Sequence, residues 1–316
     1  METKEKPCLA IVVPCYNEEL VLEQTTACLL AVLESMQQII SEDSRILYVN
    51  DGSADSTWDI IERLHSENGR IAGVNLSGNC GHQNALMAGL STAIRFADLT
   101  VTIDADLQDD ETVIKDMVNL ALEGNDIVYG VRSSRTTDTW FKRTTAQAFY
   151  RLMARMGVKT VYNHADYRLM SRRAVEALLR YGERNLFLRG LVPLLGYSTA
   201  QVEYARKERQ AGESKYPLSK MISFAFDGIT SFSMSLVHMV FWLGILFLLI
   251  AVGITIWVVA CLIQQKAITG WSSLILSIWF CSGCILIGLG IVGEYIGKIY
   301  MEVKRRPRYN IKDERL

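Results

Sequence analysis

Two long apolar segments near the carboxyl end constrain the architecture of this chain more than any other feature. Leu236–Ile263 and Trp271–Gly293 contain no formal charge over 28 and 23 residues. Each is long enough to cross a bilayer, because a membrane-spanning helix needs about 20 residues. The sequence therefore predicts two transmembrane helices, within residues 235–299, and excludes a purely soluble protein. The preceding residues have a globular composition, which excludes a multi-span transporter.

The basic residues around these segments predict their orientation. The short segment between the two spans carries only Lys266, whereas Lys298–Arg315 contains seven Lys or Arg against three acidic residues. Basic residues accumulate on the cytoplasmic side of membrane proteins. We therefore expect both chain ends in the cytoplasm and residues 300–316 as a basic cytosolic tail. Residues 217–234 are rich in Met, Ile and Phe and predict an amphipathic stretch at the membrane surface.

The overall charge balance bears on the partners of the chain. The 316 residues include 33 Lys and Arg and 34 Asp and Glu, a formal net charge of −1. A nucleic-acid-binding protein normally presents a strong basic field. We therefore expect no nucleic acid among its partners.

The region before residue 216 alternates between strand and helix patterns. Short apolar runs predict strands at Leu9–Val13, Ile46–Asn50, Ile71–Leu76, Leu99–Asp104 and Ile127–Val131. Helical periodicity lies between them, at Glu18–Ile40, Ser56–Glu67, Gln83–Phe96 and Asp110–Leu122. Such alternation is typical of a doubly wound, Rossmann-like α/β domain, which we place at residues 1–216. Ligands bind such sheets at the carboxyl ends of the strands.

Acidic and polar side chains follow three of these predicted strands. The cluster after the fourth predicted strand is the most informative. It contains Asp104 and Asp106, and Gln108 lies just beyond. Alternation places both carboxylates on one side of an extended backbone. Oxygen ligands at this density suit Mg²⁺ or Mn²⁺, with water and phosphate in the remaining positions. The sequence thus predicts a divalent metal site at this edge of the sheet.

Six ordered motifs resemble those of one enzyme family. They are VVPCYNEE, VNDGSADST, TIDADLQD, DIVYGVRSSR, DYRLMSRRAV and RQAGESKY, followed by two apolar segments and GEYIGKIYMEVKRRPRY. Together they resemble family 2 glycosyltransferases, and more closely the bacterial polyisoprenyl-phosphate glycosyltransferases. Dolichol-phosphate mannose synthase is a more distant relative. The resemblance runs from Leu9 to Tyr309 and implies a GT-A fold, an inverting transfer and the inner membrane of a bacterium.

The resemblance also implies roles for individual residues on the donor side. Asp51 would accept a hydrogen bond from the uracil ring of a UDP-sugar. The remaining donor-binding residues would be Pro14, Tyr16, Glu18, Asp104, Arg132 and Ser214. The metal, Mg²⁺ or Mn²⁺, would be held by Asp104, Asp106 and Gln108.

Other residues are expected on the acceptor side or at the leaving group. Asp166 and Arg168 would act beside the acceptor, undecaprenyl phosphate, and Lys215 would stabilise the departing diphosphate. Arg206 and Arg209 would bind the acceptor. An ionised lipid phosphate is already a nucleophile, so two roles for Asp166 stay open at this point: a base, or a group that orients an arginine.

Several alternatives concern the reaction and its partners. Glucose is the expected sugar, with N-acetylglucosamine or another hexose as the alternative. Two less favoured alternatives are a processive polysaccharide synthase and a non-catalytic membrane scaffold. The synthase would need a Q-x-x-R-W motif and more spans, and the scaffold would not need the acidic motif. Besides the UDP-sugar, the lipid acceptor and the bilayer, the resemblance implies a downstream flippase and a transferase that uses the lipid-linked sugar, and it allows a homo-oligomer.

Overall fold

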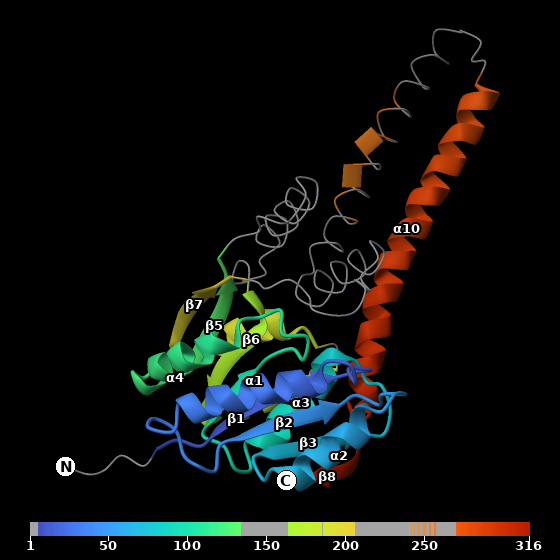
Figure 1. Ribbon diagram of the computed structural model, residues 1–316. Coiled ribbons are helices and arrows are strands. Elements are labelled where there is room, and N and C mark those ends of the chain that lie inside the picture. Colours follow the sequence, from blue (N-terminus) through green and yellow to red (C-terminus); the bar gives the residue numbers. More distant parts are fainter. Residues whose placement is uncertain are drawn as a thin grey trace.

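One eight-stranded sheet, with helices on both faces, organises the globular part of the chain (Figure 1). The computed structural model describes residues 6–133, 164–184, 186–205 and 270–316, together with single residues between 240 and 256. A long carboxyl-terminal helix extends away from the sheet (Figure 1).

The strand order across the sheet is β7-β5-β6-β4-β1-β2-β3-β8. The strands are β1 (Leu9–Cys15), β2 (Arg45–Asn50), β3 (Ile71–Leu76), β4 (Leu99–Thr102), β5 (Ile127–Arg132), β6 (His164–Ser171), β7 (Thr199–Tyr204) and β8 (Ile311–Arg315). The first five occupy the predicted positions, and β1 pairs in parallel with both β2 and β4. The prediction of an α/β domain is confirmed, but the sheet is mixed, because β6 and β8 run antiparallel to their neighbours.

The helices alternate with the strands, as predicted. They are α1 (Leu22–Ser35), α2 (Thr57–Glu67), α3 (His82–Ala93), η1 (Glu111–Val113), α4 (Ile114–Leu122), α6 (Arg172–Leu179), α7 (Leu188–Leu194) and α10 (Trp271–Lys304). The helix predicted over Glu18–Ile40 is shorter at both ends. Its first residues belong to a turn that follows Asn17, whose φ of 56° lies in the left-handed region and cannot continue a right-handed helix.

Both faces of β1 are buried, which explains its continuous apolar sequence. Leu9, Ile11 and Val13 pack in the core that includes residues of α1, α2 and α4. Ala10 and Val12 pack on the other face, against α3. That helix approaches closely because it carries small residues: a Cβ at Gly89 would lie 2.3 Å from a methyl group of Val12.

The antiparallel strand β6 brings a second set of polar residues to the expected ligand edge. It lies between β4 and β5, with Thr102 paired to Arg168. Because β6 runs in the opposite direction, its amino end meets the carboxyl end of β4. The Thr102 hydroxyl donates to the backbone oxygen of Asp166 over 2.5 Å. Thr102 and Asp166, 64 positions apart in the chain, therefore share one edge of the sheet.

The carboxyl terminus forms part of the sheet and is not simply a basic tail. Residues 311–315, expected within the tail at 300–316, form β8 and pair antiparallel with β3. Glu314 and Arg315 also bond Arg95 and Glu62, each over 2.8 Å. The physical reason is that an edge strand leaves backbone groups unpaired, and β8 covers that edge of β3.

Helix α10 corresponds to the second predicted span but continues past Gly293 to Lys304. Within the described part of the chain, α10 is the one helix long and apolar enough to cross a membrane, over Cys284–Lys304. Much of the first predicted span, Leu236–Ile263, and all of the amphipathic stretch 217–234 lie outside the described residues. The two-helix hairpin therefore stays a prediction.

Candidate active site

The loops after β1 and β2 are joined by a set of hydrogen bonds. The backbone N–H of Asn17 donates to the Ser53 hydroxyl over 2.9 Å, and the Asn17 side chain accepts from Ala54 N–H over 2.9 Å. The Glu18 N–H donates to the Thr57 hydroxyl over 3.0 Å. These bonds fix the loop that is predicted to bind the nucleoside. Of the residues predicted to contact it, Pro14 lies in β1 and the Tyr16 side chain is exposed.

Asp51 is a buried anchor for the loop between β3 and α3. Its Oδ1 accepts from the Cys80 N–H over 2.7 Å and its Oδ2 from the Gly81 N–H over 2.9 Å. Burial raises the pKa of Asp51, and these two N–H groups oppose the rise. The neighbouring Gly52 has a φ of 64°, and a Cβ there would lie 2.5 Å from the backbone nitrogen of Asn79. The two loops are therefore in backbone contact.

The acidic motif lies in the turn that follows β4. The strand ends at Thr102, two residues earlier than expected, but side-chain burial still alternates. Ala105 is buried, whereas Asp104, Asp106 and Gln108 are partly exposed together. Burial and the carboxylates of Asp109, Asp166 and Asp106 raise the pKa of Asp104, because they disfavour a further negative charge.

Asp166 lies between two arginines that come from different elements. Its Oδ1 accepts from Nη2 of Arg168 over 2.7 Å, and its Oδ2 accepts from Nη2 of Arg189, on α7, over 3.1 Å. The guanidinium groups hold the pKa of Asp166 well below its ordinary value, against the effect of its own burial. The Arg168 side chain is 2% exposed, whereas that of Arg189 is 33% exposed. Arg168 therefore lies behind Asp166, and Arg189 lies at its solvent side.

His82 connects the two carboxylate centres. It is the first residue of α3, and its Nε2 lies 3.7 Å from Oδ1 of Asp104 and 3.7 Å from Oδ2 of Asp166. The sequence analysis missed His82 and Arg189. A signal for His82 existed, because it follows closely after the carboxyl end of β3, where ligands are expected. Arg189 has no comparable signal, because it comes from a separate short helix.

Arg132 lies at the carboxyl end of β5, as expected, but it is engaged with protein groups. Its Nη2 donates to Oδ1 of Asp109 over 3.1 Å, and its Nε donates to the Tyr204 hydroxyl over 3.2 Å. Tyr204 in turn donates to Asp109 over 2.5 Å. The Arg132 side chain is 27% exposed, so it is not fully enclosed by these partners.

The structure thus brings together predicted residues from three parts of the chain. Asp104 and Asp166 share contact with His82, and Asp106 contributes to the charge around Asp104. Asp51, in the loop after β2, anchors the loop that leads to His82. The predicted residues Arg206, Arg209, Ser214 and Lys215 lie outside the described residues.

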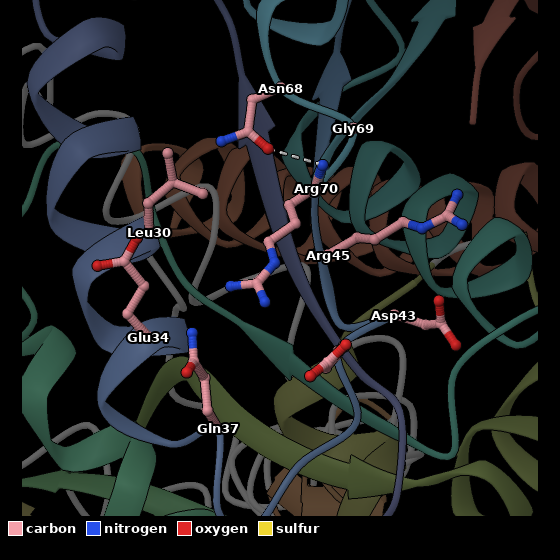
Figure 2. A pocket seen from close by; sticks show the side chains of 9 residues that line it. Leu30, Glu34, Gln37, Asp43, Arg45, Asn68, Gly69 and Arg70 are labelled. Atoms are coloured by element: carbon pink, nitrogen blue, oxygen red, sulfur yellow. Dashed lines mark hydrogen bonds between the residues drawn. The ribbon is translucent and has the colours of Figure 1, made fainter.

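A polar cavity occupies the opposite edge of the sheet (Figure 2). It has a volume of about 440 Å³ and is lined by charged residues that include Glu34, Asp43, Arg45 and Arg70. These residues lie near the amino ends of β2 and β3, where ligands of such sheets do not normally bind. We do not place the active site there.

A comparison with known proteins identifies the family. The sequence pattern of Glycosyl transferase family 2 matches residues 10–179, which run from the second residue of β1 to the end of α6. The chain belongs to glycosyl transferase family 2. It is therefore a glycosyltransferase, and the residues at the carboxyl edge of its GT-A-like mixed sheet are the family 2 candidate active site.

Several known proteins are similar to this family 2 member. A Bacillus subtilis (strain 168) protein named uncharacterized glycosyltransferase YkoT is 53% identical and covers 98% of this chain and 92% of its own length. The bactoprenol glucosyl transferase of Shigella phage SfV is 37% identical, covering 97% of this chain and 99% of that protein. A solved glucosyl-3-phosphoglycerate synthase from Mycobacterium tuberculosis is 19% identical with a TM-score of 0.47, covering 72% of this chain and 79% of that one.

Proposed function

We propose that this chain transfers one glucose from a UDP-sugar to undecaprenyl phosphate at the cytoplasmic face of a bacterial cell membrane. Full-length similarity supports the choice of acceptor and sugar, since a relative at 37% identity is named bactoprenol glucosyl transferase. N-acetylglucosamine or another hexose is the alternative donor sugar. The observation that carries the proposal is the bonding of Asp166 by Arg168 and Arg189.

The state of Asp166 suits an acceptor that arrives ionised. Transfer to a hydroxyl group requires a base that removes a proton. A carboxylate whose pKa is held far below its ordinary value by two guanidinium groups is a poor base. A phosphate monoester has a second pKa of about 6, so it is mostly ionised at neutral pH and can attack without a base. We therefore assign Asp166 as the group that orients Arg189.

Arg189 is the residue we assign to the acceptor phosphate. It is partly exposed, and a guanidinium has five N–H donors, so it can bond Asp166 and also meet a phosphate. The group of Asp166, Arg168 and Arg189 has one carboxylate and two cations. Its net positive charge favours an anion, and Arg206 and Arg209 are proposed to add to that charge.

On the donor side, the nucleoside would bind between the loops after β1 and β2. Pro14, Tyr16, Glu18 and Asp51 are proposed to form this pocket. Both Asp51 oxygens already accept backbone N–H groups, but each carboxylate oxygen has a second lone pair for the uracil N–H. Arg132, Ser214 and Lys215 are proposed to stabilise the departing diphosphate, which would be displaced in a single inverting step.

Asp104, Asp106 and Gln108 fit a divalent cation. They provide oxygen donors, which Mg²⁺ and Mn²⁺ prefer. Besides burial, the carboxylates of Asp109, Asp166 and Asp106 raise the pKa of Asp104, and a cation would neutralise this negative charge. Within residues 6–133, 164–184, 186–205 and 270–316, no three His, Cys, Asp or Glu side chains are grouped to hold a metal alone. Such a site is completed by substrate phosphates and water. The bound cation would neutralise charge on the leaving diphosphate.

The membrane attachment is proposed from two features. The segment Cys284–Lys304 of α10 has the length and composition of a span, and Leu236–Ile263 is a second apolar segment. An acceptor with a polyprenyl chain lies in the bilayer, so an enzyme anchored there meets its substrate at the membrane surface.

The experiment is a transfer assay with the purified full-length protein in detergent. It would contain Mg²⁺ or Mn²⁺, undecaprenyl phosphate and one UDP-sugar at a time, with the lipid product analysed by mass spectrometry. We expect a mass increase of one hexose with UDP-glucose. Transfer of N-acetylglucosamine alone would select the alternative, and no lipid product from any UDP-sugar would contradict the proposal.

A further inference from the structure

The residues after α10 form a strap that returns from the end of the helix to the sheet. We define the strap as residues 305–315, which include β8. Arg305 ends α10 in the left-handed conformation, with a φ of 47°, and so redirects the chain. The backbone oxygen of Arg305 accepts from Nη2 of Arg184 over 3.0 Å, and the Glu302 carboxylate accepts from the Arg184 N–H over 2.5 Å. The start of the strap is thus fixed to the globular domain.

The middle of the strap contacts the loop that Asp51 anchors. The Ser77 N–H, just after β3, donates to the backbone oxygen of Asn310 over 2.9 Å. The Asn310 backbone also lies close enough to the Cys80 thiol to lower the pKa of that thiol, against the effect of burial, and the N–H of Cys80 donates to Asp51. The Tyr309 hydroxyl hydrogen-bonds the Ser91 hydroxyl of α3 over 2.7 Å. The strap therefore touches both the loop that leads into α3 and the helix itself.

A chain of side-chain hydrogen bonds crosses the sheet from the strap to the donor side. Nδ2 of Asn75, on β3, donates to Oδ2 of Asp313 on β8 over 3.2 Å. Oδ1 of Asn75 accepts from Nδ2 of Asn50 over 2.8 Å, and Oδ1 of Asn50 accepts from the Ser53 N–H over 3.3 Å. Asn50 and Asn75 are 2% and 6% exposed. Buried polar groups of this kind need their partners, so each member constrains the next.

We propose that the strap positions the donor-binding loop, and that Asp313 is a positioning residue that acts through Asn75 and Asn50. Asn50 immediately precedes Asp51 in the chain, and Ser53 belongs to the same loop. The loss of the Asp313 acceptor would leave Nδ2 of Asn75 unpaired and free Asn75 to rotate. Rotation of Asn75 would in turn displace Asn50, to which it is bonded, and with Asn50 the Asp51–Ser53 loop. This inference rests on the proposed role of that loop in binding the nucleotide-sugar.

The strap also links α10 to the donor-binding loop. Six residues, 305–310, separate the last residue of α10 from β8. A segment so short holds the end of α10 close to the edge strand, because an extended residue spans at most about 3.6 Å. The candidate membrane helix and the donor loop are therefore joined by one continuous, bonded segment.

The test compares Asp313→Ala, Asn75→Asp and the exchange of both side chains, Asn75→Asp with Asp313→Asn. Asn75→Asp places two carboxylates in contact, whereas the exchange restores one donor and one acceptor between the same positions. We expect each single variant to raise the KM for the UDP-sugar by about threefold to tenfold, the change that loss of one hydrogen bond produces. We expect kcat to change less, and the exchange to recover most of the affinity.

Lys312→Ala is the matched control, because Lys312 is an exposed residue of β8 outside this chain of bonds. Binding of UDP to each variant, measured by calorimetry, separates donor affinity from catalysis, and the thermal midpoint reports whether the variant is folded. Folded single variants with the wild-type KM and UDP affinity would overturn the inference. So would an exchange variant as impaired as Asn75→Asp. Failure of the wild type to bind UDP would instead contradict the proposed function.

Discussion

Arg189 donates through Nη2 to Oδ2 of Asp166 over 3.1 Å, although the two residues come from α7 and β6. The other oxygen of this carboxylate accepts from the buried Arg168. Asp166 is thereby held between a buried and a partly exposed guanidinium. Of the two roles that the sequence left open for Asp166, this arrangement supports the proposed orienting role, and it leads to the first two predictions.

Asp166→Asn should impair transfer to the lipid while sparing donor binding. The neutral amide removes the negative charge that holds Arg189, so we expect turnover to fall by about 10²–10³, the scale for one preorganised electrostatic contact. Slow hydrolysis of the UDP-sugar by water should remain largely intact. UDP release with and without undecaprenyl phosphate measures both activities, and loss of UDP-sugar binding in this variant would place Asp166 on the donor side.

Arg189→Ala should raise the KM for undecaprenyl phosphate by about 10–100-fold, because a hydrogen bond to a charged group is lost. The KM for the UDP-sugar should stay within about twofold of the wild-type value. A change of that size is close to assay precision, since a tenfold change in affinity corresponds to about 1.4 kcal/mol. Arg173→Ala is a suitable control, since Arg173 is an exposed arginine that pairs with Asp126 away from the site. An unchanged acceptor KM in Arg189→Ala would remove Arg189 from the acceptor site.

Asp106→Ala should abolish transfer and leave the fold and membrane insertion intact. Asp106 is partly exposed in the turn after β4, and its main proposed role is to bind the cation. Asp116→Ala provides a matched control, because Asp116 is an exposed carboxylate on α4. Titration of the chelated enzyme with Mn²⁺ or Mg²⁺ would measure the response. Normal turnover in the variant, or in chelated wild type, would show that the metal assignment is wrong.

The two proposed spans predict a specific topology. The strand β8 pairs with β3, so the carboxyl terminus lies with the catalytic domain. Reporter fusions after Leu316 should therefore be cytoplasmic, and fusions at Lys266 should be external. The opposite result at either position would contradict the two-span arrangement.

The sequence predicted the centre of the sheet well because local composition determined it. In strands β1 to β5, mainly apolar side chains are buried on both faces of the sheet. The continuous apolar runs of these strands follow from that burial. The strand β8 was missed because Ile311–Arg315 contains four charged residues and pairs with a strand more than 230 positions away. Strand β6 and its antiparallel direction were not predicted either, because both depend on pairing with β4, more than 60 positions earlier in the chain.

Residues of the candidate site were named from the sequence where they follow strands, and were missed where they come from helices. Asp51, Asp104 and Asp106 stand directly after apolar runs, and Asp166 lies within a recognisable motif. His82 and Arg189 belong to α3 and α7, and only the packing of these helices on the sheet brings them to Asp166. Arg168 was assigned to the acceptor side on its motif, but its burial is set by the strand pairing of β6.

The most direct measurement compares two acceptors that differ only in the phosphate. Purified wild-type protein would be given UDP-glucose with either undecaprenyl phosphate or undecaprenol, and the lipid products would be quantified. With Asp166 held as a poor base and Arg189 at the proposed acceptor position, the enzyme should glycosylate the phosphate and leave the alcohol unreacted. Equal or preferential transfer to the alcohol would contradict the account.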